Sequence, residues 1–436
     1  MKKFDQFIFE SYQFDKDNLT IDLNYSFDGQ LNFTETISWN DMNIDENYSE
    51  AALDAAMSML HVTLGVSYYK AYMPAHMAVK STNLTSDQSV FFNDLYSNGL
   101  GEFIYRNGLK FSDIASFQQA NPVPHLISDS DPAGTKALVP MSGGKDSILT
   151  AEILKSAKID FRPLYMTTDG NYPGIIDRFE KPILVKRQIS KELIAENKLR
   201  ALNGHVPFSA ILDSILAVTA VLYGFADVVL SHESSADEAT VEYDGRSVNH
   251  QYSKSSIFEK LISNFVKTNI SAGISFFSLL RNFSELEIHK LFVRKGLFDK
   301  YNGEWSSCNQ ANYKQGQDTT NLKWCGKCSK CANAFILFAP FADKDKLIEM
   351  FSGNNLATNS ELENDFKSLL GMNESKPFEC VGEINELRHA ITMAFESGDW
   401  PEFERYVLQL KKQPEQKSAR LKIDDKYQIA TEDYIA

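Results

Sequence analysis

The chain has 436 residues, of which 43% are hydrophobic and 23% are charged, and its formal net charge is −14. This composition is typical of a soluble globular protein, and the length favours two or three domains. The acidic balance argues against nucleic acid as the main partner, because affinity for its phosphates requires lysine and arginine. The polar first residues predict no signal peptide, and no apolar stretch reaches the roughly 20 residues of a membrane span. We therefore expect a cytoplasmic protein with no membrane partner.

The first region, residues 1–125, is predicted to be an α+β domain. Apolar residues alternate with polar ones over 19–25 and 31–39, on either side of Asp28-Gly29, which predicts a β-meander with a tight turn. A helix is expected from about Ser49, and Ser86 is expected to cap another. The polar, proline-bearing stretch from Gln119 to Lys136 is the expected linker to the next domain.

Residues 137–154 predict a strand, a tight turn and a helix. The apolar run Ala137-Leu138-Val139 precedes two glycines, and apolar residues at helical spacing follow them. Glycines let backbone N–H groups approach an anion closely, and the first helical turn adds unpaired N–H donors and the positive end of the helix dipole. Lys145 adds a point charge. The pattern predicts a phosphate-binding loop, although the spacing is not that of a Walker A motif.

The run S-G-G-K-D-S in this loop resembles the phosphate loop of the PP-loop ATP pyrophosphatases. The resemblance implies that a substrate oxygen attacks the α phosphate of ATP, which yields an adenylated substrate and pyrophosphate. The alternative is an ordinary serine-rich turn between a strand and a helix. On the first interpretation the phosphates are held by Ser142, Gly143, Gly144, Lys145 and Ser147.

Beyond the loop, strands alternate with helices, which predicts an α/β domain with a parallel sheet over residues 126–345. Strands are expected at 161–166, 183–186 and 227–231, and helices at 193–202, 208–223, 256–267 and 285–292. Ligands of such sheets lie at the carboxyl ends of the strands. The functional loops are therefore expected at 142–147, 167–171, 203–207 and 231–254.

The cysteines predict a metal site. Cys325, Cys328 and Cys331 follow the spacing C-x2-C-x2-C, and Cys308 is an upstream candidate for a fourth ligand. Four thiolates would close a tetrahedral zinc site, three could instead hold an iron–sulfur cluster, and reduced cysteines without metal are the remaining alternative. Without an export signal, metal is favoured over disulfides. The fifth, Cys380, is near Phe378 and next to Val381 and is expected to be a core residue.

The last region, residues 346–436, is predicted to be helical, and its polar tail beyond Lys411 is expected to be loosely held. Across all three regions, short motifs in the same order resemble the UDP-N-acetylmuramoyl-L-alanyl-L-glutamate epimerases, a family built on a PP-loop domain. One departure is Ser234, where the family typically has arginine. The matching stretches are residues 65–70, 98–103, 105–109, 143–147, 203–207, 248–254, 324–326, 330–331 and 376–383.

The family resemblance implies that the L-glutamate end of the muramoyl dipeptide is converted to D-glutamate, with ATP cleaved to AMP and pyrophosphate. Two other enzyme readings stay open: an adenylating enzyme like the 7-cyano-7-deazaguanine synthases, which share a cysteine zinc site, and a tRNA-thiolating relative, which the acidic balance disfavours. A non-enzymatic nucleotide-binding module is a further alternative. The sequence does not indicate the oligomeric state.

We assign the remaining polar groups as hypotheses. Asp146 in the loop and Glu233 after a buried strand are the candidates for a magnesium ion, since carboxylates there could bridge it to the nucleotide phosphates. A solvated loop is the alternative for Glu233, and local capping is the alternative for the histidine at 205. The unranked candidates for proton transfer and substrate binding are His205, His250, Tyr252 and Lys254.

Overall fold

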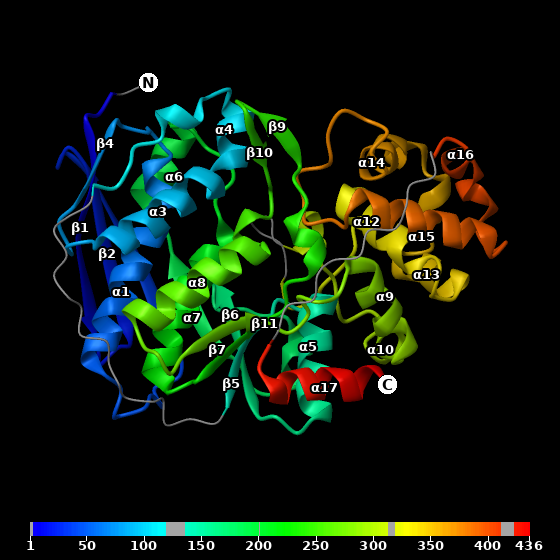
Figure 1. Cartoon of the computed structure of the whole chain (residues 1–436), viewed down its shortest axis with the longest axis horizontal. Helices are drawn as coiled ribbons and strands as arrows, with labels where there is room; N and C mark the ends of the chain where they lie inside the picture. The colour runs from blue at the N-terminus through cyan, green and yellow to red at the C-terminus, as the bar shows by residue number, and fades with distance from the viewer. Residues whose placement is uncertain (1–2, 119–135, 200, 313–318, 411–422) are drawn as a thin grey trace.

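The computed structural model describes residues 3–118, 136–199, 201–312, 319–410 and 423–436. Its centre is one nine-stranded sheet with the order β11-β8-β5-β6-β7-β3-β2-β1-β4 (Figure 1). The strands are β1 Gln6–Asp15, β2 Thr20–Phe27, β3 Leu31–Trp39, β4 His76–Val79, β5 Ala137–Pro140, β6 Phe161–Thr167, β7 Ile183–Gln188, β8 Asp227–Leu230 and β11 Ser275–Ser278. A separate two-stranded ribbon pairs β9 (Val241–Tyr243) with β10 (Arg246–Val248).

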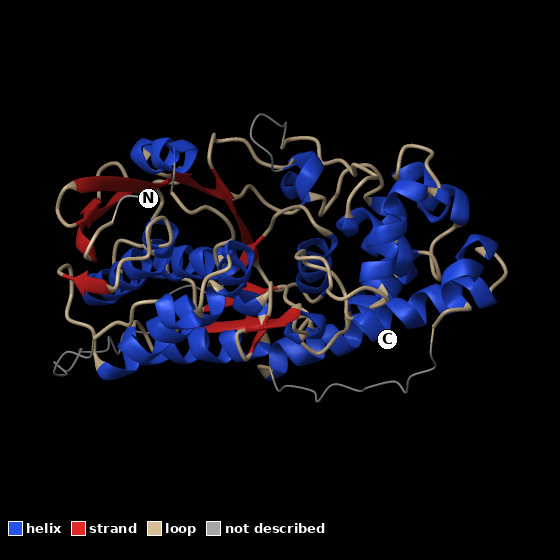
Figure 2. Ribbon diagram, turned by 90° about the horizontal axis from the view of Figure 1, so that it is seen from above, coloured by secondary structure: helices blue, strands red, loops and turns tan. Residues whose placement is uncertain are grey.

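The helices fall into two groups in the sequence, before and after residue 300, and contacts of α9 with α12 and α15, and of α17 with α5, connect the two groups. The first group comprises α1 Glu50–Leu64, α2 Val66–Tyr69, α3 Ser86–Gly99, α4 Gly101–Asn107, α5 Lys145–Ser156, α6 Lys191–Leu199, α7 Phe208–Tyr223, α8 Ser256–Asn269, α9 Glu285–Arg294 and α10 Leu297–Lys300. The second comprises α11 Asn309–Asn312, α12 Ser329–Phe338, α13 Lys344–Met350, α14 Glu363–Leu369, α15 Ile384–Glu396, α16 Glu404–Val407 and α17 Asp425–Ile435. Figure 2 shows that one end of the molecule consists of helices only.

Strand β3 joins the amino-terminal meander to the parallel strands. It pairs antiparallel with β7, from Thr36 opposite Gln188 to Trp39 opposite Val185, so that the two predicted domains share one sheet. The predicted meander and its Asp28-Gly29 turn are confirmed. The predicted linker lies, apart from residue 136, outside the described residues, and the division at residue 125 stays a prediction.

The parallel half of the sheet contains a reversal of strand order at its centre. From β5 the chain continues to β6 and β7 on one side, and then crosses to β8 and β11 on the other. In open α/β sheets a crevice forms at such a reversal, outside the carboxyl ends of the two strands. The loops after β5 and β8 therefore face the most favourable ligand position of the fold, and both were predicted to be functional. The structure confirms the α/β class with a largely parallel sheet.

Both faces of the parallel strands are buried, which explains their continuous apolar sequences. Leu138 of β5 and Val228 of β8 belong to one core, whereas their neighbours Val139 and Val229 belong to a second core on the other face. Helix α7 packs in the first core against α1, and α5 and α12 contribute to the second. The predicted bounds of α7 are confirmed: Pro207 precedes it and Gly224, in the left-handed conformation with φ of 69°, ends it.

Two local predictions are wrong. Thr85, not Ser86, caps α3, because its hydroxyl accepts a hydrogen bond from the backbone N–H of Gln88, and the side-chain oxygen of Gln88 accepts one from the backbone N–H of Thr85. For the tail beyond Lys411, residues 411–422 lie outside the described residues, but its end is not loosely held, since α17 packs against α5 and the fully buried Tyr427 donates a 2.9 Å hydrogen bond to Asp227 at the start of β8. In the part of the chain that the structure describes, every helix falls short of the length and apolar character that crossing a membrane requires.

Candidate active site

The loop after β5 has the geometry that its sequence predicts. Gly143 adopts φ of +82°, and a Cβ there would lie 2.4 Å from Cδ1 of Leu322, so only glycine fits. Gly144 caps the start of α5 in an extended conformation, and its added Cβ would meet nothing closer than 3.7 Å. The loop therefore presents bare backbone and the first N–H groups of a helix at the crevice between β5 and β8.

A buried ion network lies beside this loop. Nζ of Lys145 is 2.7 Å from Oδ1 of Asp146 and 2.9 Å from Oε2 of Glu285. Burial alone would lower the pKa of Lys145, but the charges of Asp146 and Glu285 outweigh it and raise that pKa. Burial raises the pKa of Glu285 to about 7, and burial together with Asp146 raises the pKa of Glu233. Three carboxyl groups thus surround one lysine, an arrangement that favours an added cation.

One cavity connects the loop to residues from three other parts of the chain. Its walls carry four of the predicted site residues together with side chains that the sequence did not single out. The lining residues are Lys145, Asp146, Glu233, Gln251, Lys254, Glu285, His289, Ser307, Trp324, Lys330, Asn333, Ala334, Phe338 and Cys380.

A second cluster of ionisable groups adjoins this cavity around Cys380. Nζ of Lys254 lies 3.4 Å from Sγ of Cys380, and the side chain of His250 also hydrogen-bonds the sulfur. The other contact of His250 is with Glu102, whose Oε2 lies 2.5 Å from Nδ1 of His250 and 3.2 Å from Nδ1 of His205. Thus Glu102, His250 and Cys380 form a continuous line of hydrogen bonds.

The pKa values of Cys380 and His250 are shifted in opposite directions, each towards the charged form of the side chain. Burial alone raises the pKa of Cys380, but the cations of Lys254 and Lys330 and the bond from His250 hold it well below its ordinary value. Burial would lower the pKa of His250, yet its bonds to Cys380 and Glu102 raise that pKa to about 9. Burial and the charge of His250 lower the pKa of His205 to about 4. A thiolate beside an imidazolium, with a neutral second imidazole, follows.

Two groups of described residues lie close enough to hold a metal ion: the four cysteines, and Glu102 with His205 and His250. Atoms bound to one tetrahedral zinc ion at about 2.0 Å lie about 3.3 Å apart. The 2.5 Å separation between Glu102 and His250 is shorter than this. We therefore interpret the second group as hydrogen-bonded side chains, and the four cysteines as the metal-binding group.

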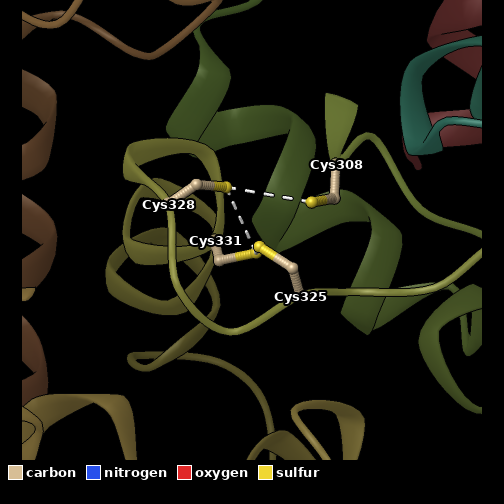
Figure 3. Close-up of side chains that lie close together, drawn as sticks. All are labelled: Cys308, Cys325, Cys328 and Cys331. Carbon is tan, nitrogen blue, oxygen red and sulfur yellow. Dashed lines mark hydrogen bonds between the residues drawn. The ribbon is translucent and has the colours of Figure 1, made fainter. Parts of the chain in front are cut away.

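The four cysteines converge as predicted (Figure 3). The Sγ–Sγ distances are 3.8 Å for Cys308 and Cys328, 3.7 Å for Cys325 and Cys331, and 3.6 Å for Cys328 and Cys331. These distances exclude disulfides, and all five cysteines of the chain are free. The four cysteines predicted as metal ligands therefore lie together as one possible metal-binding cluster.

This cluster also fixes the wall of the cavity. Its ligands are the direct neighbours of lining residues: Ser307 precedes Cys308, Trp324 precedes Cys325 and Lys330 precedes Cys331. Helix α12 begins immediately after Cys328, and its Asn333 accepts a 3.0 Å bond from the Gly382 amide in the segment that carries Cys380. A metal ion held here would therefore support the site as well as the fold.

Comparisons with known proteins identify the family. The family model described as the MurL N-terminal domain matches residues 1–279, and that of the MurL C-terminal domain matches residues 304–424. The chain belongs to the MurL family. Three similar proteins are named UDP-N-acetyl-alpha-D-muramoyl-L-alanyl-L-glutamate epimerase, and epimerases are isomerases. The family predicted from the sequence motifs is confirmed.

These relatives match the chain over most of its length. The protein of Xanthomonas oryzae pv. oryzae is 34% identical over 355 residues, which are 80% of this chain and 77% of the relative. That of Salinispora tropica is 33% identical over 92% of this chain and 87% of its own length. A Micromonospora protein is 32% identical over 92% of this chain and 89% of its own length.

The motifs that resemble the MurL family meet at the Cys380 cluster. Glu102, His205, His250 and Cys380 each belong to a different one of those stretches, separated by up to 278 residues. Glu102, Glu285 and Cys380 were not predicted from the sequence to lie in this region. The signal for Glu102 and Cys380 was their position within family motifs, whereas nothing in the sequence around Glu285 indicated a function.

The other predicted loop and acid–base residues are not among those that line the cavity: Ser142, Gly143, Gly144, Ser147, His205, His250 and Tyr252. The Tyr252 hydroxyl donates to the carboxylate of Asp94, which places it against α3. Ser234, at the position where the family typically has arginine, donates from its hydroxyl to the Phe283 carbonyl at 3.1 Å. A buried arginine nearby, Arg281, binds the carbonyls of Glu233 and Lys254 at 2.7 Å each and so fixes these two cavity residues.

Proposed function

We propose that this protein converts the terminal L-glutamate of UDP-N-acetylmuramoyl-L-alanyl-L-glutamate to D-glutamate, at the expense of ATP and through an acyl-adenylate. Membership of the MurL family supports the substrate and the inversion. The observation that supports the mechanism is that one cavity adjoins two kinds of groups. The glycine loop after β5 lies at the strand reversal and is suited to phosphate, and the acid–base groups around Cys380 lie beside it.

The physical problem is the weak acidity of the α-hydrogen. A carboxylate opposes formation of a second negative charge on the adjacent carbon. Transfer of an adenylyl group to that carboxylate removes its charge, so that an enolate can form and be stabilised by nearby donors. A base then removes the proton, a proton is added to the opposite face, and water cleaves the adenylate to release AMP.

The phosphate side of the reaction falls to the loop after β5. Ser142, Gly143, Gly144 and Ser147 would hold the phosphates with backbone N–H groups and hydroxyls, as in the PP-loop ATP pyrophosphatases. The buried cation of Lys145 would balance the charge of the leaving pyrophosphate. Asp146 and Glu233 line the same cavity and are suited to hold Mg²⁺, which would neutralise the phosphates.

We further propose that the four cysteines hold a structural zinc ion. Thiolates bound about 2.3 Å from one tetrahedral zinc lie about 3.8 Å apart. The observed separations of 3.6–3.8 Å match this value. In a multi-iron cluster the thiolates bind separate irons and spread more widely. The zinc alternative is therefore favoured over the iron–sulfur one.

Incubation with the L,L-dipeptide nucleotide, ATP and magnesium in heavy water tests the proposed function. AMP and pyrophosphate should form, and the D-glutamate product should carry deuterium at its α carbon, since the abstracted proton exchanges with solvent. Omission of ATP should stop both inversion and exchange. Release of AMP without α-exchange would instead support an amide- or nitrile-forming enzyme. Exchange without ATP would rule out the adenylate.

A further inference from the structure

We propose that the Cys380 thiolate is the base that removes the α-proton of the activated glutamate, and that Glu102 and His250 position and maintain it in that form. This inference rests on the proposed function and adds the identity of the proton acceptor. It reverses the expectation from sequence that Cys380 is a core residue.

The position of Cys380 supports this role. It lines the same cavity as Lys145 and Asp146, so a substrate whose carboxylate reaches the ATP-binding loop also comes near the sulfur. Cys380 is only partly buried, unlike a core cysteine. It is the one cysteine, among those in the described residues, that stands outside the metal-binding group.

The segment that carries Cys380 is anchored from both sides. Lys376 bonds the Gly382 carbonyl at 3.0 Å and the carboxylate of Glu238. Phe378 stacks on Tyr105 of α4, with ring centroids 5.2 Å apart, beneath the guanidinium of Arg106. These contacts hold the carboxy-terminal turn against the helix that supplies Glu102. The sulfur is therefore fixed with respect to its partners, as a base must be.

The groups that face the sulfur keep it ionised. Lys254, from the turn after β10, lies 3.4 Å away, Lys330 of α12 adds a second positive charge, and His250 hydrogen-bonds the sulfur. Glu102 holds His250 at its Nδ1 atom. This arrangement is that of an activated cysteine, in which a carboxylate orients an imidazolium and the imidazolium stabilises a thiolate.

The step balances without a further reactant. The thiolate takes the α-proton and becomes a thiol, while the electron pair of the C–H bond moves to the carbonyl oxygen as an enolate. A proton from water is added to the opposite face of the α carbon, and the thiol returns its proton to solvent. Hydrolysis then separates AMP from the D-configured product.

The decisive experiment separates adenylation from proton removal in the Cys380→Ser variant. Adenylation is followed by the substrate-dependent exchange of labelled pyrophosphate into ATP, and proton removal by deuterium uptake at the α carbon. We expect the variant to keep pyrophosphate exchange and to lose α-exchange by about 10²- to 10⁴-fold, the usual contribution of a general base.

Each other outcome is informative. If Cys380→Ser exchanged the α-hydrogen as fast as the wild-type protein, the assignment of Cys380 as the base would be overturned. Loss of both half-reactions would also overturn it, because adenylation needs no base at the α carbon. A covalent substrate adduct on Cys380 would show a nucleophile instead of a base. Deuterium uptake by the wild-type protein without pyrophosphate exchange would rule out the acyl-adenylate and the proposed function. The deuterium uptake of Cys380→Ser would still test whether Cys380 is the base.

The positioning role has its own readout. The pH titration of thiolate ultraviolet absorbance, as the difference between wild type and Cys380→Ser, reports this sulfur alone because the metal-binding thiolates cancel. We expect a midpoint below the ordinary cysteine pKa of about 8.5. In Glu102→Gln the midpoint should rise, since an amide no longer keeps His250 protonated. An unchanged midpoint would restrict Glu102 to a structural role.

Discussion

The loop after β5 and the Cys380 cluster adjoin the same cavity, but they are built in different ways. The loop motif is a single stretch of six residues, 142–147, that covers the turn after β5 and the first turn of α5, and its conformation follows from local chemistry. The cluster takes Glu102 from α4, His250 and Lys254 from the segment after β10, and Cys380 from the turn before α15. A contiguous motif can be recognised from its residues alone, whereas an assembled site depends on the fold.

This difference predicts that variants of the loop impair adenylation, measured as pyrophosphate exchange, and that variants of the Cys380 cluster impair proton removal, measured as deuterium uptake. Only changes to the four-cysteine cluster, which supports both regions, are expected to abolish both half-reactions.

The largest effect is expected for the common support. Cys331→Ser removes a fully buried sulfur at the start of α12, and the ligand set of the proposed zinc ion then falls from four to three. We expect the loss of bound zinc, a loss of unfolding free energy on the order of several kcal/mol, and the loss of both half-reactions. Metal analysis and thermal denaturation measure these effects.

Cys380→Ser is the matched control, since it removes a cysteine that is not among the metal-binding group, and it should keep both zinc and stability. A Cys331→Ser protein with normal stability and pyrophosphate exchange would show that the four cysteines do not support the site.

The next effect compares two buried lysines of the same cavity. Lys145→Met should reduce pyrophosphate exchange by about 10²- to 10³-fold, because it removes a cation from the region where phosphate charge develops. Lys254→Met should instead keep pyrophosphate exchange and reduce deuterium uptake, because the sulfur loses the ammonium 3.4 Å away. Both reactions are measured on both variants. Equal losses of both reactions in both variants would contradict the division of labour.

A smaller effect is expected within the loop. Gly143→Ala places a Cβ 2.4 Å from Leu322 at a φ of +82°, so it should lower the unfolding free energy by about 1–3 kcal/mol. Gly144→Ala meets no protein atom closer than 3.7 Å and should leave stability unchanged. If phosphate lies against this backbone, Gly144→Ala should still raise the KM for ATP. Denaturant titration measures the stability of both variants, and steady-state kinetics measures the KM for ATP. An unaltered KM in Gly144→Ala would show that the phosphates do not bind against this backbone.

The smallest effect is expected outside both regions. Tyr427→Phe removes the 2.9 Å hydrogen bond from α17 to Asp227 and should cost about 1 kcal/mol of unfolding free energy without changing either half-reaction. Thermal denaturation measures the change. A large loss of activity would mean that the docking of α17 on α5 controls the cavity. Activity would then depend on a third region besides the loop and the Cys380 cluster.

The sequence predicted most of the elements because their signals are local. Alternation around Asp28-Gly29 specified the meander, the apolar run of 208–223 specified α7, and S-G-G-K-D-S between a strand and a helix specified the loop. The spacing of Cys325, Cys328 and Cys331 is equally local, since side chains three residues apart can lie on the same side of one turn. Thr85 and Ser86 show the limit: both can cap a helix, and the reciprocal bond with Gln88 decides between them.

Only the tertiary structure decided the order of the strands and the chemistry of the second cluster. The pairing of β3 with β7 depends on chain segments about 150 residues apart, for which no local pattern exists. The sequence does not distinguish the ionisation of His205 from that of His250. In the structure, burial lowers the pKa of His205 to about 4, while bonds to Cys380 and Glu102 raise the pKa of His250 to about 9. The ionisation of Cys380 is likewise a property of its neighbours. Electrostatic environment is set by distances between remote residues, and those distances exist only after folding.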